Sequence, residues 1–232
     1  MNLNEVIILA GGKGTRIQAV LNDLPKCLAP INGHPFLFYL INYLKNNGIK
    51  KYIFSLGYNS KKIIDYVENF HFELDYEFVI ESFPLFTGGA ISEAIDSCVS
   101  ENILIINADT LFEIDIQLLF KYHIKNRSDC TIALKMMKNF ERYGVVNIND
   151  KNRILSFKEK KYYEQGLING GIYILNITNF KKHVFEESFS FEKEYLEKYV
   201  NTDQFYGFVY DHYFIDIGVP EDYYKAQLEI NL

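Results

Sequence analysis

Short apolar runs alternate with segments of helical periodicity through the first half of the chain. The apolar runs predict buried strands at residues 6–10, 52–56, 76–80 and 103–106. Apolar positions at helical spacing predict helices at residues 35–47, 59–70, 88–98 and 116–125, with Asn59 as the cap of the second. Strands that alternate with helices are typical of a mostly parallel sheet covered by helices on both faces.

The second half is richer in strands. Its β-rich runs lie at residues 130–136, 144–148, 154–157, 168–175 and 205–217. A turn at residues 149–152 predicts an antiparallel pair, short helices are expected near 179–184 and 192–199, and Pro220 begins a final helix. Because no linker or repeat interrupts the chain, we expect one domain over residues 1–232. Its fold class is α/β, a three-layer, Rossmann-like, mostly parallel sheet with a β-rich insertion in the second half.

Composition narrows the classes of function. The chain has 232 residues, of which 48% are hydrophobic and 23% charged, as in ordinary globular proteins. Its net charge of −6 argues against a nucleic-acid partner, because proteins that hold a nucleic-acid backbone present a basic surface. A small phosphorylated ligand stays compatible with this charge if a few cations and backbone amides converge on one cleft.

Cysteine usage and hydropathy indicate the compartment. Cys27, Cys98 and Cys130 are widely spaced and form no Cys-x-x-Cys pair, which is typical of reduced thiols. The start of the chain lacks the basic segment and long apolar segment of a secretory leader. The longest apolar stretch, residues 36–44, is interrupted by Asn42 and is shorter than the roughly 18 residues of a membrane span. We expect a cytoplasmic protein with no membrane partner.

A glycine-rich loop directly follows the first predicted strand. It reads Leu9-Ala10-Gly11-Gly12-Lys13-Gly14-Thr15-Arg16, and Pro25-Lys26 follows ten residues later. Glycines after a buried strand let the backbone turn and bring N–H groups against phosphate oxygens, while Lys13, Arg16 and Lys26 add positive charge. The loop lacks the spacing of a P-loop or of a dinucleotide fingerprint. It therefore predicts a polyphosphate site of another kind.

The loop and six later segments resemble the sugar-1-phosphate nucleotidyltransferases. The later segments are Thr87-Gly88-Gly89-Ala90, Asn107-Ala108-Asp109-Thr110, Tyr143-Gly144-Val145-Val146, Phe157-Lys158-Glu159-Lys160, Asn169-Gly170-Gly171-Ile172-Tyr173 and the segment from Asp216 to Tyr223. Their order and spacing agree with the family over nearly the whole chain. The resemblance implies a GT-A-like fold. It also implies attack by a sugar 1-phosphate on the α-phosphorus of a nucleoside triphosphate, which releases pyrophosphate.

Two carboxylates are the candidate metal ligands. Asp109 follows a buried strand, at the edge where open α/β sheets bind ligands. Asp216 lies in a second strand pattern that can project toward the same cleft. Two carboxylates, substrate phosphates and waters suit Mg²⁺, the cofactor that we expect. The alternative for each residue is an acceptor in a turn or a helix cap.

The resemblance also implies roles for the other residues of these segments. Arg16 and Lys26 would neutralise the β- and γ-phosphates, and Lys160 would bind the sugar phosphate; these three are the catalytic candidates. The nucleotide-binding candidates are Leu9, Ala10, Gly11, Gly12, Lys13, Gly14, Thr15, Glu81, Thr87, Gly88, Asn107 and Ala108. The sugar-binding candidates are Asp109, Tyr143, Gly144, Glu159, Asn169 and Gly170. The departures from the family pattern are Phe86 for a glycine, Lys161 for a proline and Val219 for a threonine.

Glu81 indicates the base. It stands where relatives that use thymidine or uridine carry glutamine. A carboxylate only accepts hydrogen bonds, so it complements the N1–H and N2–H₂ donors of guanine, whereas an amide suits uracil. The other interpretation is a solvated glutamate at a strand end. Together with an overall resemblance to short bacterial heptose-1-phosphate guanylyltransferases, Glu81 favours transfer of GMP from GTP to a heptose 1-phosphate, with mannose 1-phosphate second, for surface polysaccharide synthesis.

Two alternatives stay open. The first is a cytidylyl-, uridylyl- or thymidylyltransferase of the same fold that acts on a hexose 1-phosphate. The second is a noncatalytic regulatory relative, which is expected to lack at least one of the charged site residues, yet all of them are present here. A homo-oligomer is also compatible with the sequence.

Overall fold

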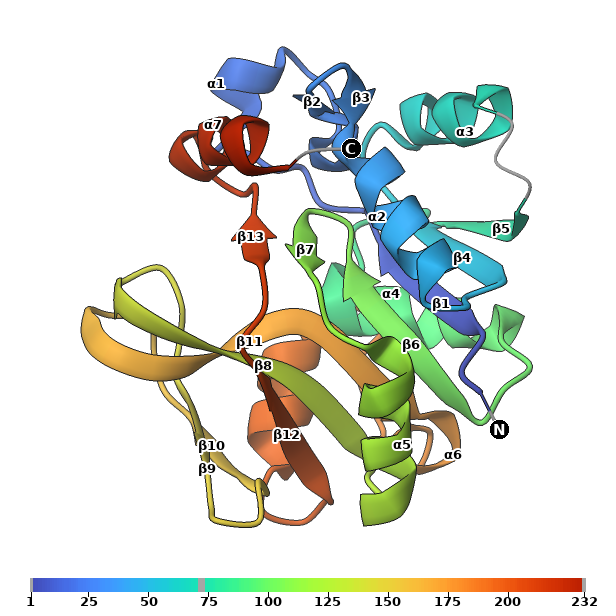
Figure 1. Cartoon of the computed structure of the whole chain (residues 1–232). Helices are drawn as coiled ribbons and strands as arrows, with labels where there is room; N and C mark the ends of the chain where they lie inside the picture. Colours follow the sequence, from blue (N-terminus) through green and yellow to red (C-terminus); the bar gives the residue numbers. More distant parts are fainter. Residues whose placement is uncertain (1, 71–73, 231–232) are drawn as a thin grey trace.

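The core of the molecule is a seven-stranded sheet with helices on both faces (Figure 1). The computed structural model describes residues 2–70 and 74–230. The strand order is β12-β8-β11-β6-β1-β4-β5. The bounds are β1 Glu5–Leu9, β4 Lys51–Leu56, β5 Asp75–Ile80, β6 Asn102–Asn107, β8 Cys130–Phe140, β11 Tyr163–Asn176 and β12 Phe205–Tyr210. Strands β6, β1, β4 and β5 are parallel, and β12 is parallel to β8, whereas β11 runs antiparallel to both of its neighbours.

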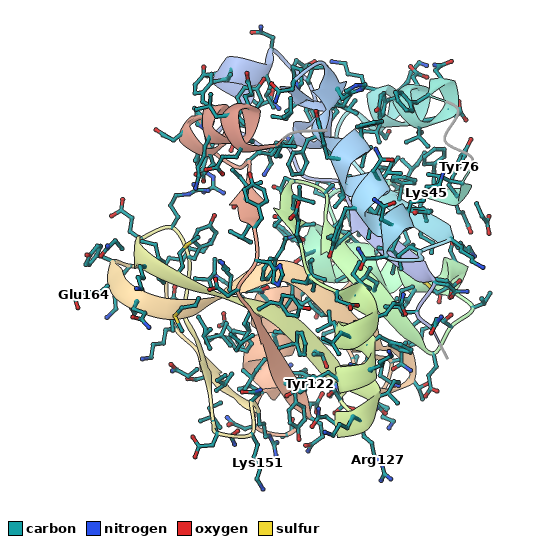
Figure 2. All side chains as sticks on the ribbon, in the orientation of Figure 1. Lys45, Tyr76, Tyr122, Arg127, Lys151 and Glu164 are labelled. Atoms are coloured by element: carbon teal, nitrogen blue, oxygen red, sulfur yellow. The ribbon has the colours of Figure 1, made fainter. Side chains whose placement is uncertain are left out.

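Two hydrophobic cores lie on the two faces of the sheet, and Figure 2 shows the side chains of the described residues on the ribbon. One core receives α2 Phe36–Asn46, α3 Ser60–Asn69, α5 Ile116–Asn126 and α7 Pro220–Glu229. The other receives α4 Phe86–Ala94, α6 Ile177–Phe180 and the π-helical turn η3 Phe191–Glu197. Alternation along β6 shows the division, because Leu104 and Ile106 face the first core while Ile103 and Ile105 face the second. The three layers follow from this pattern.

Three small antiparallel pairs flank the main sheet. They are β2 Pro30–Ile31 with β3 His34–Pro35, β7 Thr110–Phe112 with β13 Phe214–Asp216, and β9 Val146–Ile148 with β10 Ile154–Phe157. The short helices α1 Gln18–Leu21, η1 Lys26–Leu28 and η2 Ile95–Ser97 complete the fold. The outer ends of β8 and β11 pair over Phe140 and Tyr163, and Phe140, Val145 and Ile168 form a small third core. This projecting part is the β-rich portion of the second half (Figure 1).

The α/β class and the order of strands and helices expected in the first half are confirmed. The single strand expected over residues 205–217 is wrong, because the chain leaves β8 at Tyr210 and then pairs with β7 from Phe214. Asn59 does not cap α3 with its side chain, since its Nδ2 donates to the Asp23 carbonyl at 2.9 Å. No helix among the described residues is long and apolar enough to cross a membrane.

Candidate active site

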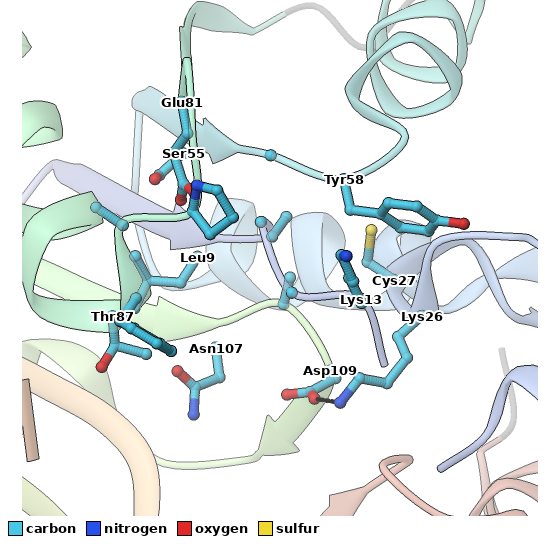
Figure 3. A pocket seen from close by; sticks show the side chains of 18 of the residues that line it. Leu9, Lys13, Lys26, Cys27, Ser55, Tyr58, Glu81, Thr87, Asn107 and Asp109 are labelled. Carbon is cyan, nitrogen blue, oxygen red and sulfur yellow. Dashed lines mark hydrogen bonds and ion pairs between the residues drawn. The ribbon is translucent and has the colours of Figure 1, made fainter. Parts of the chain in front are cut away.

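A cavity of about 870 Å³ opens at the carboxyl ends of β1, β4, β5 and β6 (Figure 3). Parallel strands end at the same edge of a sheet, so segments distant in sequence meet there. The lining residues are Leu9, Ala10, Gly11, Gly12, Lys13, Lys26, Cys27, Ser55, Gly57, Tyr58, Glu81, Ser82, Phe83, Pro84, Phe86, Thr87, Ala90, Asn107, Ala108, Asp109, Ser190 and Glu192. Eleven of the residues expected at the site are among them.

The glycine-rich loop forms one wall of this cavity. Main-chain hydrogen bonds fix its start, because the Ala10 N–H donates to the Ser55 carbonyl at 2.8 Å and the Tyr58 N–H donates to the Gly11 carbonyl at 3.2 Å. Gly14 has φ +60°, and a Cβ there would lie 2.7 Å from Cγ of Lys26. Glycine at this position therefore lets the loop turn and lets the Lys26 side chain pass close to the backbone.

The two carboxylates expected to bind metal lie side by side. Asp216 pairs with Thr110 in the register of β13 and β7, and the Ile217 N–H donates to the Asp109 carbonyl at 3.0 Å. Lys26 forms an ion pair with Asp109. Burial and the neighbouring charge of Asp109 raise the pKa of Asp216. The sequence therefore brings two carboxylates and one lysine to a single place.

Asp216 is also held by residues of the β-rich portion. The Tyr143 hydroxyl donates to its Oδ2 at 3.1 Å, and the Gly218 N–H donates to its Oδ1 at 2.7 Å. Arg142 lies 3.4 Å from Asp216 and forms an ion pair with Asp222. The Asp216 carboxylate is thus oriented by several donors.

Glu81 lies at the other end of the cavity from the Lys26–Asp109 pair (Figure 3). Its N–H continues the sheet by donating to the Leu56 carbonyl at 2.8 Å. One carboxylate oxygen accepts from the Leu85 N–H at 3.3 Å. Burial raises the pKa of Glu81, with smaller effects of the Leu85 hydrogen bond and of Glu93. An acceptor group is thus fixed at the end of the cavity opposite its cationic group.

The sequence did not predict Ser190 and Glu192, which lie at the start of η3, where Ser190 is the cap. The Thr87 hydroxyl donates to Glu192 at 2.8 Å and accepts from the Phe191 N–H at 3.0 Å. These partners are about a hundred positions apart, and residues 190–192 match none of the family segments quoted above. No local signal could have identified them, since only the packing of η3 against α4 brings them to the cavity.

Most residues expected to contact the sugar do not line the cavity. Tyr143 contacts Asp216, as described, and Asn169 donates to the Tyr173 hydroxyl at 2.8 Å. Glu159 and Lys160 are exposed. Gly170 is buried, and a Cβ at Gly144 would meet the Lys158 carbonyl at 2.4 Å, so both glycines also serve packing. Asp109 alone among the sugar-binding candidates lines the cavity.

Four further candidates lie outside the lining. Thr15 and Arg16 are exposed on the loop, and Gly14 contacts Lys26 instead of the cavity. A Cβ at Gly88 would lie 2.2 Å from the Phe189 ring, so this glycine permits close packing and does not face the cavity.

Other chemistry is limited by what the structure contains. Among residues 2–70 and 74–230, no group of three or more His, Cys, Asp or Glu side chains could hold a metal ion. Cys27 lines the cavity but is buried, and burial raises its thiol pKa to about 12. It is therefore a packing residue at neutral pH.

Comparison with known proteins identifies the family. The nucleotidyl transferase family matches residues 5–231. The chain is 48% identical over 226 residues to D-glycero-alpha-D-manno-heptose 1-phosphate guanylyltransferase of Aneurinibacillus thermoaerophilus, covering 97% of this chain and 98% of that protein. It is 42% identical over 220 residues to the protein of the same name from Campylobacter jejuni, covering 95% and 97%. The structure of HddC from Yersinia pseudotuberculosis complexed with GMP-PN has a TM-score of 0.89 at 38% identity, covering 99% of this chain and 100% of that chain. The chain belongs to the nucleotidyl transferase family.

Proposed function

We propose that the protein transfers GMP from GTP to a D-glycero-D-manno-heptose 1-phosphate, which gives GDP-heptose and pyrophosphate. The observation that carries this proposal is the 48% identity to a heptose 1-phosphate guanylyltransferase over almost the full length of both chains. The GMP-PN complex of HddC supports the guanine nucleotide. Residues 1–232 would act as one catalytic domain in the cytoplasm, where free thiols such as Cys27 and Cys130 persist, and would supply polysaccharide synthesis.

The cavity suits a nucleotide that lies along its length. Glu81 would accept hydrogen bonds from N1–H and N2–H₂ of guanine at one end. The N–H groups of the glycine-rich loop, with Lys13 and Lys26, would meet the phosphates at the other end. Arg16 would add its charge from the exposed part of the loop. Thr87, Asn107 and Ala108 also line the cavity and would contact the nucleoside.

Asp109 and Asp216 fit Mg²⁺. Asp216 ends β13 and Asp109 directly precedes β7, the strand paired with it, and burial together with the charge of Asp109 raises the pKa of Asp216. Oxygen ligands in small number, completed by phosphates and waters, are what Mg²⁺ takes from a protein. When bound, the ion would neutralise charge on the triphosphate and favour its reaction with a second anion.

The protein's own residues would then act by positioning. A phosphate oxygen of the sugar 1-phosphate attacks the α-phosphorus of GTP while the bond from that phosphorus to the β-phosphate oxygen breaks, and pyrophosphate leaves. Lys26 would hold the departing phosphates, and Lys160 would bind the incoming phosphate. Tyr143, Gly144, Glu159, Asn169 and Gly170 would contact the sugar. Two bound anions held in line need little covalent help from the protein.

The direct test is pyrophosphate release with Mg²⁺ for ATP, GTP, CTP, UTP and dTTP, each against a set of hexose and heptose 1-phosphates. We expect the highest kcat/KM for GTP with D-glycero-α-D-manno-heptose 1-phosphate, with mannose 1-phosphate second. Preference for another triphosphate or a hexose would contradict the assigned substrates. Nucleotide binding without release for any pair would instead identify a noncatalytic relative.

A further inference from the structure

Phe86 adopts a backbone conformation that its residue type disfavours. Its φ is +55°, in the left-handed region that favours glycine. The other non-glycine residues with positive φ are five asparagines, Asp23 and Arg127, so Phe86 is the only aromatic residue among those described. Asparagine and aspartate tolerate this region, because their short polar side chains hydrogen-bond locally, whereas phenylalanine gains no such compensation.

The surrounding structure imposes this conformation. The Leu85 carbonyl accepts from the Phe189 N–H at 3.1 Å, and the Gly88 N–H donates to the Phe189 carbonyl at 2.9 Å. Glu81 accepts from the Leu85 N–H at 3.3 Å. The main chain is thus fixed on both sides of Phe86, which is the condition under which a strained residue persists in a fold.

The strained residue adds little to the core. Leu85 and Gly88 on either side are buried, yet the Phe86 side chain is 68% exposed. Burial of apolar surface is what an aromatic ring contributes to stability, and this ring keeps most of its surface outside. Because the strain at Phe86 is not explained by packing, a functional role is the remaining reason for it.

Phe86 forms part of the cavity wall. Phe86 lines it together with Phe83, which is 43% exposed, and Pro84. The Glu81 carboxylate, which would read the base edge, accepts a hydrogen bond from the N–H of Leu85, the residue directly before Phe86. An apolar aromatic surface therefore adjoins the acceptor group at the same end of the cavity.

We propose that Phe86 is held in this conformation so that its ring stacks on the face of the nucleobase. This inference rests on the proposed function for the identity of the ligand. It divides the base site between two residues. Glu81 selects guanine through its edge, while Phe86 contributes affinity without selecting a base, because every base has a face on which an aromatic ring can stack.

The test compares binding of GTP and of pyrophosphate, which has no base, to variants of the whole protein in the presence of Mg²⁺ by calorimetry. Phe86→Ala removes the ring and keeps a Cβ, Phe86→Gly removes both, and Phe86→Tyr keeps the ring. We expect Phe86→Ala and Phe86→Gly to weaken GTP binding about tenfold and to leave pyrophosphate binding unchanged. Phe86→Tyr should bind GTP as the original chain does. Tyr224→Ala, an exposed aromatic outside the cavity lining, is the matched control and should change neither.

The backbone strain at Phe86 is tested by thermal unfolding. Without ligand, Phe86→Gly should unfold at a higher temperature than Phe86→Ala, because only glycine accepts φ +55° freely. Equal unfolding temperatures would overturn the strain argument. Unchanged GTP binding in Phe86→Ala, or an equal loss for pyrophosphate, would overturn the stacking role.

Failure of the proposed function would be seen separately. The binding measurements need no sugar phosphate and no turnover, so they are made with whichever triphosphate the turnover assay selects, or with the one that binds most tightly if none turns over. A base-dependent loss in Phe86→Ala would then support stacking even if GTP and heptose 1-phosphate were the wrong substrates.

Discussion

The proposed nucleotide end and the proposed sugar end of the site differ in how firmly the fold holds their residues in place. Many of the cavity residues lie on the loops directly after four parallel strands, and main-chain bonds continue the sheet into those loops, as from the Ala108 N–H to the Leu9 carbonyl at 3.0 Å. At the sugar end, the Lys160 side chain is exposed and makes no hydrogen bond or ion pair with any described residue. The part of the cavity proposed to read the base is therefore fixed by the sheet edge, whereas the lysine proposed to bind the sugar phosphate is surrounded by solvent.

This difference affects how each end can select its ligand. Groups fixed by a sheet edge lose little freedom when they bind, so they can read a base by hydrogen-bond pattern. Exposed lysines and glutamates lose side-chain freedom on binding, and each contact gains less. Asp109, Asp216 and Tyr143 lie at the junction of the two ends, where both substrates would meet.

The largest effect is expected at that junction. Asp109→Asn removes the charge that faces Asp216 and Lys26 and should lower the rate of Mg²⁺-dependent pyrophosphate release by roughly 1,000-fold, because the loss of one metal ligand weakens transition-state stabilisation by several kcal/mol. Nucleotide binding should be largely retained, since Lys26 is freed for the phosphates. Initial rates and calorimetric binding of GTP give the two quantities.

Asp65→Asn is the matched control for this substitution. Asp65 pairs with Lys61 at 2.9 Å on the exposed surface of α3, so its loss also breaks a lysine–aspartate pair but touches no part of the cavity. Surface pairs of this kind contribute little, and the rate should stay close to that of the original chain. An unimpaired rate in Asp109→Asn would remove Asp109 from the metal site.

A smaller effect is expected at the sugar end. Lys160→Ala should lower kcat/KM for the sugar 1-phosphate about 100-fold through loss of a charge-assisted hydrogen bond, while the dissociation constant of GTP stays unchanged. Lys161→Ala is the control, because Lys161 is an adjacent exposed lysine placed over the Tyr163 ring. An equal loss in both variants would show a general effect of surface charge, and an effect of Lys160→Ala on GTP binding would break the division into two ends.

The same division explains what could be predicted from the sequence. The positions of the segments at residues 9–16 and 107–109 could be predicted from the sequence. Hydrophobic periodicity predicts the strands that precede them, and the carboxyl ends of parallel strands lie at the same edge of a sheet. Ser190 and Glu192 could not be predicted, since a π-helical turn brings them in from the far part of the chain. The strained φ of Phe86 was equally hidden, because main-chain bonds to Phe189 impose it.

The smallest effect is expected at Glu81, where it is also the most selective. Glu81→Gln keeps one acceptor oxygen and replaces the other with a donor, so it should weaken GTP use about tenfold while UTP use changes little. The amide oxygen can still accept from the Leu85 N–H, so the unfolding temperature should be preserved. Initial rates with GTP and UTP give the ratio. Equal losses for both triphosphates would mean that Glu81 does not read the base.

The pH dependence of that ratio tests the same carboxylate without a substitution. Burial raises the pKa of Glu81 above its ordinary value of 4.5, and only the ionised form accepts from both guanine donors. The preference for GTP over UTP should therefore fall as the pH is lowered toward that raised pKa, and it should begin to fall at a higher pH than an exposed glutamate would give. Titration of the triphosphate is common to both nucleotides and cancels in the ratio. The Glu81→Gln variant should show a flat ratio, and a parallel fall in that variant would assign the dependence to another group.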